Sequence, residues 1–207
     1  MIAGVPMAAI AHGVPAAGQV RLPRGWWAGG AAQPRFVIAT AACTGLVAAM
    51  IGAAVPVNVT LPAFWIFAVV GVGLAVVDVR RRRLPHRLTG MLWASSGLCF
   101  VVSAHATGDT GDLARACAVG AIVAAVMLVI ALALPGQLGF GDVVFTGAIT
   151  FNLGWLSWQA AAIGLLAGLL LQAALAVVGR LRRSGNSPTP MGPALVAGWC
   201  LGAVVGS

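Results

Sequence analysis

Lysine, glutamate and tyrosine are absent from the 207 residues of this chain. Aromatic residues, here phenylalanine and tryptophan, make up 7%. Charged residues make up 8%, whereas about a quarter of the residues in a soluble globular domain are charged. Apolar residues account for 60% of the chain. These values exclude an ordinary soluble domain and predict an integral membrane protein.

The few cysteines and the basic residues exclude two further classes. Cys43, Cys99, Cys117 and Cys200 lie in apolar runs and form no CxxC pair, so the pattern predicts neither a zinc site nor a disulfide framework. We therefore expect no metal and no other cofactor. All twelve basic residues are arginine, and they fall in short segments between apolar runs. This placement indicates membrane topology rather than binding to nucleic acid.

Apolar runs of the length needed to cross a membrane, roughly 20 residues, recur along the chain. They predict an all-α bundle of six or seven transmembrane helices. The expected segments are 36–55, 61–79, 88–105, 115–134, 143–157, 159–178 and 191–206. Residues 1–35 are expected to form a loose cytosolic tail, because Pro6 and Pro15 interrupt their apolar start and no cleaved signal peptide is indicated. Residues 36–207 would form the membrane domain.

The arginines set the expected orientation of this bundle. With seven spans, eleven of the twelve fall on one side and only Arg115 falls on the other. The arginine-rich side is then cytosolic and includes the N-terminus. The run Arg80, Arg81, Arg82 and Arg83 is expected to hold anionic lipid headgroups, at about 1 kcal/mol per basic residue.

The sequence also predicts the positions of several uncharged polar and aromatic side chains. Trp65, Trp155 and Trp158 fall near the external ends of their helices, where they would lie in the headgroup layer. Asn152 and Gln172 lie inside predicted helices, so we expect both to face the bundle and form hydrogen bonds across it.

The four aspartates divide into two pairs. Asp109 and Asp112 fall in a predicted external loop with glycine and threonine, which is typical of a solvated turn. Asp78 ends the second predicted helix and Asp142 begins the fifth, so both are expected at the cytosolic boundary. Ionisable groups at membrane depth are costly and usually have a function.

Two interpretations of Asp78 and Asp142 remain open from their spacing. If the bundle brings them together, repulsion should leave one protonated and one ionised, and such a pair can activate water and protonate a leaving amine. Alternatively, Asp78 pairs with Arg82 and Asp142 merely favours a helix N-terminus. Gly139 and Gly141 would permit unusual dihedrals and close approach, and backbone N–H groups near them could stabilise an oxyanion.

Three segments of the chain resemble, in order, the motifs of the type IV prepilin peptidases. Asp78 to His86, read as DVRRRRLPH, is similar to the family's D-x5-(I/L)-P-N segment, and Gly139 to Asp142 is similar to its GxGD motif. Thr189 to Pro193, read as TPMGP, is similar to the PFGP start of its last helix. The resemblance covers about residues 36–206. By motif position Asp78 and Asp142 correspond to the catalytic aspartates, with supporting positions at Pro85, His86, Gly139, Gly141, Pro190, Gly192 and Pro193.

The resemblance implies an activity and a location. Members of this family are membrane aspartic peptidases that remove the leader of prepilin-like substrates at the cytosolic face of the bacterial inner membrane. Longer members carry an N-terminal insertion with paired CxxC motifs, linked to methylation of the product. This chain lacks such motifs and resembles the short form associated with Flp or Tad-type pili.

Departures from the family pattern keep other functions open. His86 stands where Asn is usual, Met191 where Phe is usual, and Val144 where a Lys commonly follows the GxGD motif. Losing that Lys removes a cation near Asp142, which the arginines of the 80–83 run would have to replace. The alternatives are a catalytically degenerate structural homologue in a pilus or secretion platform, and a small proton-coupled transporter. A transporter would be expected to spread polar groups through the membrane depth.

Overall fold

The computed structural model describes residues 5, 33–81, 86–108, 110–134, 138–182 and 190–207. Within these ranges the regular structure is entirely helical, which confirms the all-α prediction. The seven helices are α2 (Pro34–Ala54), α3 (Leu61–Arg81), α4 (His86–Thr107), α5 (Thr110–Ala133), α6 (Phe140–Leu156), α7 (Trp158–Arg182) and α8 (Gly192–Gly206). Most of the expected tail, 1–35, lies outside the described residues.

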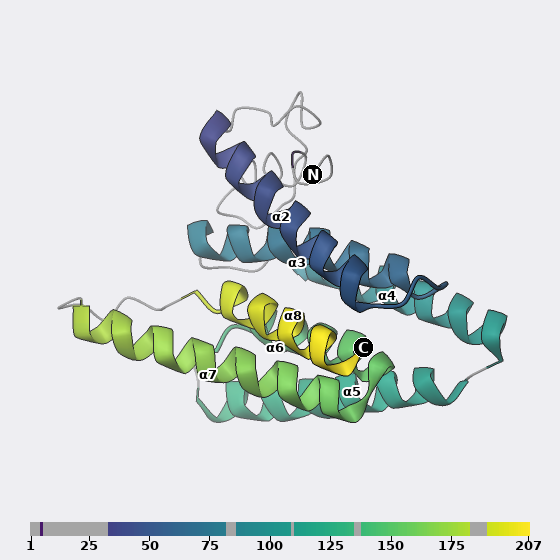
Figure 1. The fold of residues 1–207 in the computed structure, drawn as a ribbon. Coiled ribbons are helices and arrows are strands. Elements are labelled where there is room, and N and C mark those ends of the chain that lie inside the picture. Colours follow the sequence, from purple (N-terminus) through teal and green to yellow (C-terminus); the bar gives the residue numbers. More distant parts are fainter. Residues whose placement is uncertain (1–4, 6–32, 82–85, 109, 135–137, 183–189) are drawn as a thin grey trace.

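Successive helices run in opposite directions along one bundle (Figure 1). As a result α3, α5 and α7 end, and α4, α6 and α8 begin, at one end, which lies on the left of Figure 1. We call it the aspartate end, because Asp78 and Asp142 lie there. Five helices, α2, α3, α4, α5 and α7, are long and apolar enough to cross a membrane. The chain is therefore a polytopic membrane protein.

The helix boundaries differ from the predicted ones by up to five residues, and the largest difference is at α5. This helix begins at Thr110 rather than at 115, so Asp112 lies in its first turn instead of in a loop. Asp112 forms an ion pair of 2.7 Å with Arg115, one helical turn later. The expectation of a solvated turn at Asp112 was wrong, while Asp109 lies outside the described residues.

The two shortest helices occupy the centre of the bundle. Thirteen of the seventeen residues of α6 and nine of the fifteen of α8 are buried. In contrast, only 17–33% of the apolar windows of α2, α4, α5 and α7 are buried inside the protein. Longer helices thus cover most of α6 and α8, which explains why these two need not match the full membrane thickness.

Stacked aromatic rings join the central helices. Phe67 of α3 lies between Phe145 of α6 and Trp199 of α8, at ring-centroid distances of 6.4 and 4.7 Å. Phe100 of α4 stacks on Trp155 of α6 at 4.5 Å. Trp155 is only 7% exposed, so its expected place in the headgroup layer was wrong. The pairing with Phe100 offers its large ring more contact than the headgroup layer would.

Close glycine packing fixes α8 against α7. Gly164 and Gly168 on α7 face Gly198 and Gly202 on α8, in two facing GxxxG patterns. A Cβ atom on Gly202 would come within 2.6 Å of the Ala160 carbonyl oxygen, a distance that real Cβ atoms do not show. Small residues let helix backbones approach this closely in a membrane. The contact sets the position of the α8 N-terminus.

A polar contact adds to the attachment of α8. The indole N–H of Trp199 donates to Asn152 Oδ1 on α6 at 2.8 Å, and Asn152 is fully buried. This confirms the prediction that Asn152 bonds across the bundle. Gln172 of α7 is half-buried.

Candidate active site

Asp78 lies on α3, one turn before the helix ends at Arg81, and is 5% exposed. Its Oδ2 atom accepts a hydrogen bond of 2.7 Å from the backbone N–H of Gly192. This donor lies at the start of α8, where backbone N–H groups have no partner within the helix. A buried carboxylate is stabilised by such donors and by the helix dipole.

Gly192 is required by the closeness of α8 to α3. A Cβ atom there would lie 3.0 Å from the Cα of Ala75 and 3.1 Å from the Cβ of Asp78. Any side chain would therefore push the start of α8 away from the Asp78 carboxylate. Pro193 follows in the first turn, where a missing N–H group costs nothing, and Pro190 precedes the helix half-buried. Close packing and helix-start geometry therefore explain the glycine and the prolines of the TPMGP segment.

Asp142 occupies the third position of α6, whose N-cap is Gly139. Its carboxylate lies beside the Gly139 backbone, and the backbone N–H of Asp142 donates to the Gly139 carbonyl at 2.9 Å. A carboxylate in the first turn is favoured by the helix dipole. Asp142 is half-buried, whereas Asp78 is buried.

The expectation of an unusual backbone conformation at Gly139 was wrong. Gly139 has φ −77° and ψ 144°, an extended conformation open to most residues, and among the described residues the glycine with positive φ is Gly108. Gly139 instead leaves room for the carboxylate, because a Cβ there would lie 3.1 Å from Asp142 Oδ2. Gly141 is buried in the first turn of α6.

The two carboxyl groups belong to one site at the aspartate end. They are near enough for the charge of Asp78 to act on Asp142. The bundle thus brings together, around one pair of carboxyl groups, parts of all three segments that carry the resemblance: Asp78, the Gly139–Asp142 turn and Gly192. A buried carboxyl and a half-buried one in the same site can act as acid and base on a bound water molecule.

Other predicted site residues are placed only in part. Pro85 lies outside the described residues, as do Arg82, Arg83 and Thr189, and the side chains of Arg81 and His86 are not described either. The guanidinium of Arg80 lies over the ring of Phe36 in α2, 4.5 Å from its centroid. This contact directs Arg80 toward α2. Within the described part of the chain, no three His, Cys, Asp or Glu side chains gather as a metal site.

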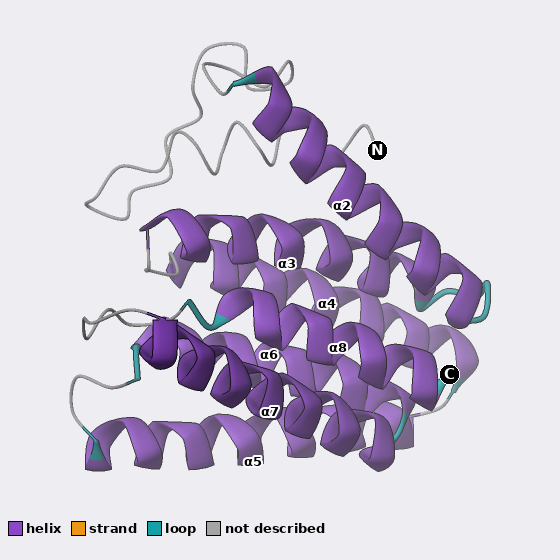
Figure 2. Ribbon diagram, turned by 60° about the vertical axis from the view of Figure 1, so that its left-hand side comes forward, coloured by secondary structure: helices purple, strands orange, loops and turns teal. Residues whose placement is uncertain are grey.

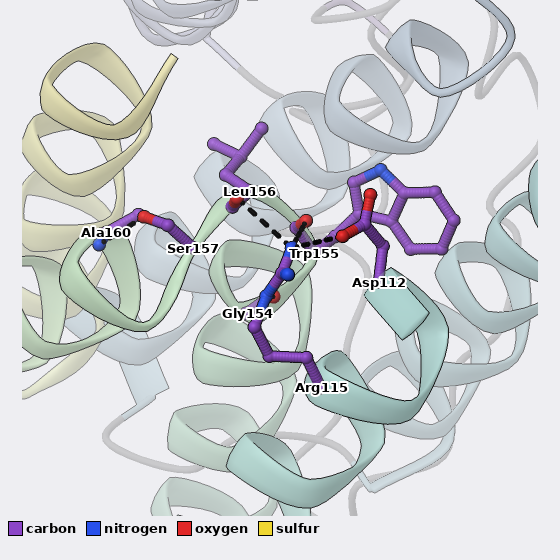
Figure 3. A network of polar contacts seen from close by, with 7 residues as sticks. All are labelled: Asp112, Arg115, Gly154, Trp155, Leu156, Ser157 and Ala160. Atoms are coloured by element: carbon purple, nitrogen blue, oxygen red, sulfur yellow. Dashed lines mark hydrogen bonds and ion pairs between the residues drawn. The ribbon is translucent and has the colours of Figure 1, made fainter. Parts of the chain in front are cut away.

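A second polar network, at the opposite end of the bundle, was not expected from the sequence (Figure 3). Arg115 of α5 donates to the carbonyl of Gly154 at 2.8 Å, to that of Trp155, and to that of Leu156 at 3.1 Å. It therefore caps the C-terminus of α6, while Asp112 neutralises its charge. The Asp112–Arg115 spacing signals the ion pair, but nothing in the sequence indicates the carbonyl partners.

The fold and this site define a class: a polytopic helical membrane protein with two carboxyl groups together at one end. Comparison of the chain with protein-family models, with curated proteins and with solved structures finds no match.

Proposed function

We propose that this protein is a membrane aspartic endopeptidase that removes the leader peptide of Flp or Tad-like type IV prepilins. The observation that carries the proposal is the meeting of Asp78, Asp142 and Gly192. These residues come from three segments far apart in the chain, each of which resembles a prepilin peptidase motif. The proposal includes a bacterial inner membrane with the aspartate end on the cytosolic side, as the arginine asymmetry indicates.

The proposed reaction uses both carboxyl groups and one water molecule. The ionised carboxylate takes a proton from water while the water oxygen bonds to the scissile carbonyl carbon. The other carboxyl group, which is protonated, supplies its proton to the leaving amine. The C–N bond then breaks, and the two carboxyl groups return to their starting states with one proton between them. Asp142 is the less buried of the two side chains, so we expect substrate to approach from its side.

The test replaces each aspartate by asparagine during co-expression with a short Flp-type prepilin. Asp78→Asn and Asp142→Asn should each abolish leader cleavage, because an amide cannot exchange the proton. The asparagine oxygen at position 78 can still accept the Gly192 N–H group, so the start of α8 keeps its partner. Cleavage is read as the mass of the prepilin, at matched membrane levels of each variant.

Asp112→Asn is the matched control, because it removes a carboxylate at the opposite end of the bundle. It should leave cleavage within a few-fold of the parent. Full activity in either Asp78→Asn or Asp142→Asn would end the aspartic peptidase proposal.

One observation favours a second candidate, a structural homologue without catalysis. The Asp78 carboxylate already binds the Gly192 N–H group at the start of α8, a role that would preserve it in a scaffold. A scaffold predicts that the parent cleaves none of several prepilins, and that Asp78→Ala lowers the melting temperature while Asp78→Asn does not. Cleavage by the parent would exclude this candidate.

A further inference from the structure

A deep apolar groove runs between α2, α3 and α8, next to the carboxyl pair but facing away from the bundle core. Its volume is about 530 Å³, and its walls are almost entirely apolar side chains. Examples are Val47 of α2, Val76 of α3 and Ala197 of α8. Figure 2 shows why it exists: α2 diverges from α3 toward its own N-terminus, so the space between them widens at the aspartate end.

The groove is about half as long, measured along the helix axes, as a membrane is thick. At 1.5 Å per residue, its wall on α3 from Val72 to Arg80 is about 12 Å long, and its wall on α2 from Phe36 to Val47 is about 17 Å long. The hydrocarbon core of a bilayer is about 30 Å thick. The groove therefore opens at the helix ends and stops near the middle of the bilayer, so it spans one leaflet.

The volume separates a lipid chain from a protein helix. A cavity of about 150 Å³ holds benzene, so a volume of about 530 Å³ corresponds to roughly twenty carbon atoms. This is the scale of a single fatty acyl chain. A helix about 10 Å wide would need roughly 900 Å³ over the same 12 Å depth, and it would continue through the other leaflet.

Among the described residues that line the groove, the charged side chain is Arg80, at its open end. It is exposed, and its guanidinium lies over the Phe36 ring. An arginine stacked on an aromatic ring keeps N–H donors in its own plane, and these fit the oxygens of a phosphate in pairs. A positive group at the surface above an apolar groove is complementary to an anionic headgroup above its acyl chain.

We propose that the groove between α2, α3 and α8 binds one anionic phospholipid of the leaflet at the aspartate end. Its phosphate contacts Arg80, and one acyl chain fills the groove as far as Val47 and Cys200. The bound chain lies against Ala75 and Val79, which flank Asp78 on α3, and against Pro193, which follows Gly192. The lipid thereby fills the space between α2 and the two helices that hold Asp78. This site is independent of the proposed peptidase function.

The test is native mass spectrometry of the full-length protein in detergent, titrated with phosphatidylglycerol and, separately, with phosphatidylcholine. We expect saturable retention of one phosphatidylglycerol, and weaker retention of phosphatidylcholine. Arg80→Gln should weaken the retained phosphatidylglycerol by about tenfold, because it removes the charged partner of the phosphate. Ala197→Phe, at an exposed groove position, should abolish saturable binding by filling the groove.

Two matched controls decide whether the site is specific. Arg180→Gln removes an exposed arginine at the same end of the bundle, on α7, and Ala173→Phe adds the same bulk to an exposed position of α7. Both should bind lipid as the parent does. Equal weakening by Arg80→Gln and Arg180→Gln, or equal retention of the two lipids, would overturn the proposal.

Other occupants would also be visible in this experiment. A dimer that Ala197→Phe converts to monomer would assign the groove to a second copy of the chain. Displacement of the retained lipid by one equivalent of prepilin would assign it to a substrate helix. Either result would overturn the lipid site, and neither depends on whether the protein cleaves.

Discussion

Gly192 and Asp78 fix each other in position, and this contact is the smallest structural unit on which the candidate site depends. The carboxylate supplies an acceptor for the Gly192 N–H group at the start of α8, and the missing Cβ of Gly192 lets α8 come close enough to use it. Neither feature works without the other, because a side chain at 192 would strike the backbone at Ala75.

Gly192→Ala should therefore destabilise the protein and abolish cleavage. The added Cβ would lie 3.0 Å from a backbone atom of α3, which cannot move alone, so we expect a loss of about 1–3 kcal/mol. The melting temperature in detergent and the cleavage assay measure the two effects.

Gly97→Ala is the matched control for this prediction. Gly97 lies within α4, and no atom lies within 4 Å of the point that a Cβ atom would occupy, so alanine should raise stability by about 0.5–1 kcal/mol. If Gly192→Ala were as stable and active as the parent, the contact with Asp78 would not hold the site.

Sequence reasoning named Asp78, Asp142 and Gly192, which the structure brings together, but it did not predict the contacts between them. The helical pattern alone assigned Asp78 and Asp142 to the same end, since one ends a predicted helix and the other begins one. The hydrogen bond from Gly192 to Asp78 joins residues 114 positions apart, and no local pattern encodes it. The sequence also did not predict the role of Gly139, which is to leave space for the Asp142 carboxylate and not to adopt an unusual backbone conformation.

At the scale of helices, two contacts set how the central pair is held: the arginine cap on α6 and the glycine contact between α7 and α8. The arginine cap could not be predicted from the sequence, because the acceptors of Arg115 are backbone carbonyls. The second does have a sequence signal, the GxxxG spacing in Gly164–Gly168 and Gly198–Gly202. The existence of each helix was predictable from apolar run length, whereas the exact ends depend on such caps.

Arg115→Met should lower the stability of the bundle by about 2 kcal/mol, because the last carbonyls of α6 lose a charged donor. Thermal unfolding in detergent measures this change. Cleavage per folded molecule should stay close to that of the parent, because the cap lies at the end opposite to Asp142.

Asp112→Asn separates the cap from the ion pair. It keeps Arg115 on the carbonyls and removes only the partly exposed Asp112 charge, so we expect at most about 1 kcal/mol. An equal loss in Arg115→Met and Asp112→Asn would contradict the view that the carbonyl contacts dominate.

Gly198→Val should disconnect α8 from α7. A Cβ at this position would lie 2.5 Å from the backbone nitrogen of Gly168 and 2.6 Å from its Cα, so α8 must move away. We expect a loss of about 3 kcal/mol or more, of the order seen for overpacked contacts, together with loss of cleavage. Gly90→Val on α4, where no atom lies within 4 Å, should have little effect on either measurement.

For the whole molecule, the seven helices and the arginine asymmetry predict opposite sides for the two ends of α8. Reporter fusions at Gly185, which lies outside the described residues, and at Ser207 should report the cytosol and the external side, respectively. α8 has 15 residues, about 22 Å, so it is the shortest of the described helices and the critical one. The same side for both fusions would mean that α8 does not cross the membrane.

The difference in length between the central and outer helices links the site to the membrane around it. α6 and α7 share the turn at Ser157, yet α6 has 17 residues and α7 has 25, so α7 extends about 12 Å further at the aspartate end. Most of α7 is exposed to the surroundings of the bundle, and a helix longer than the bilayer accommodates the mismatch by tilting. Bilayer thickness, a property of the membrane and not of the chain, therefore sets the tilt of α7 at the end of the bundle where Asp142 lies.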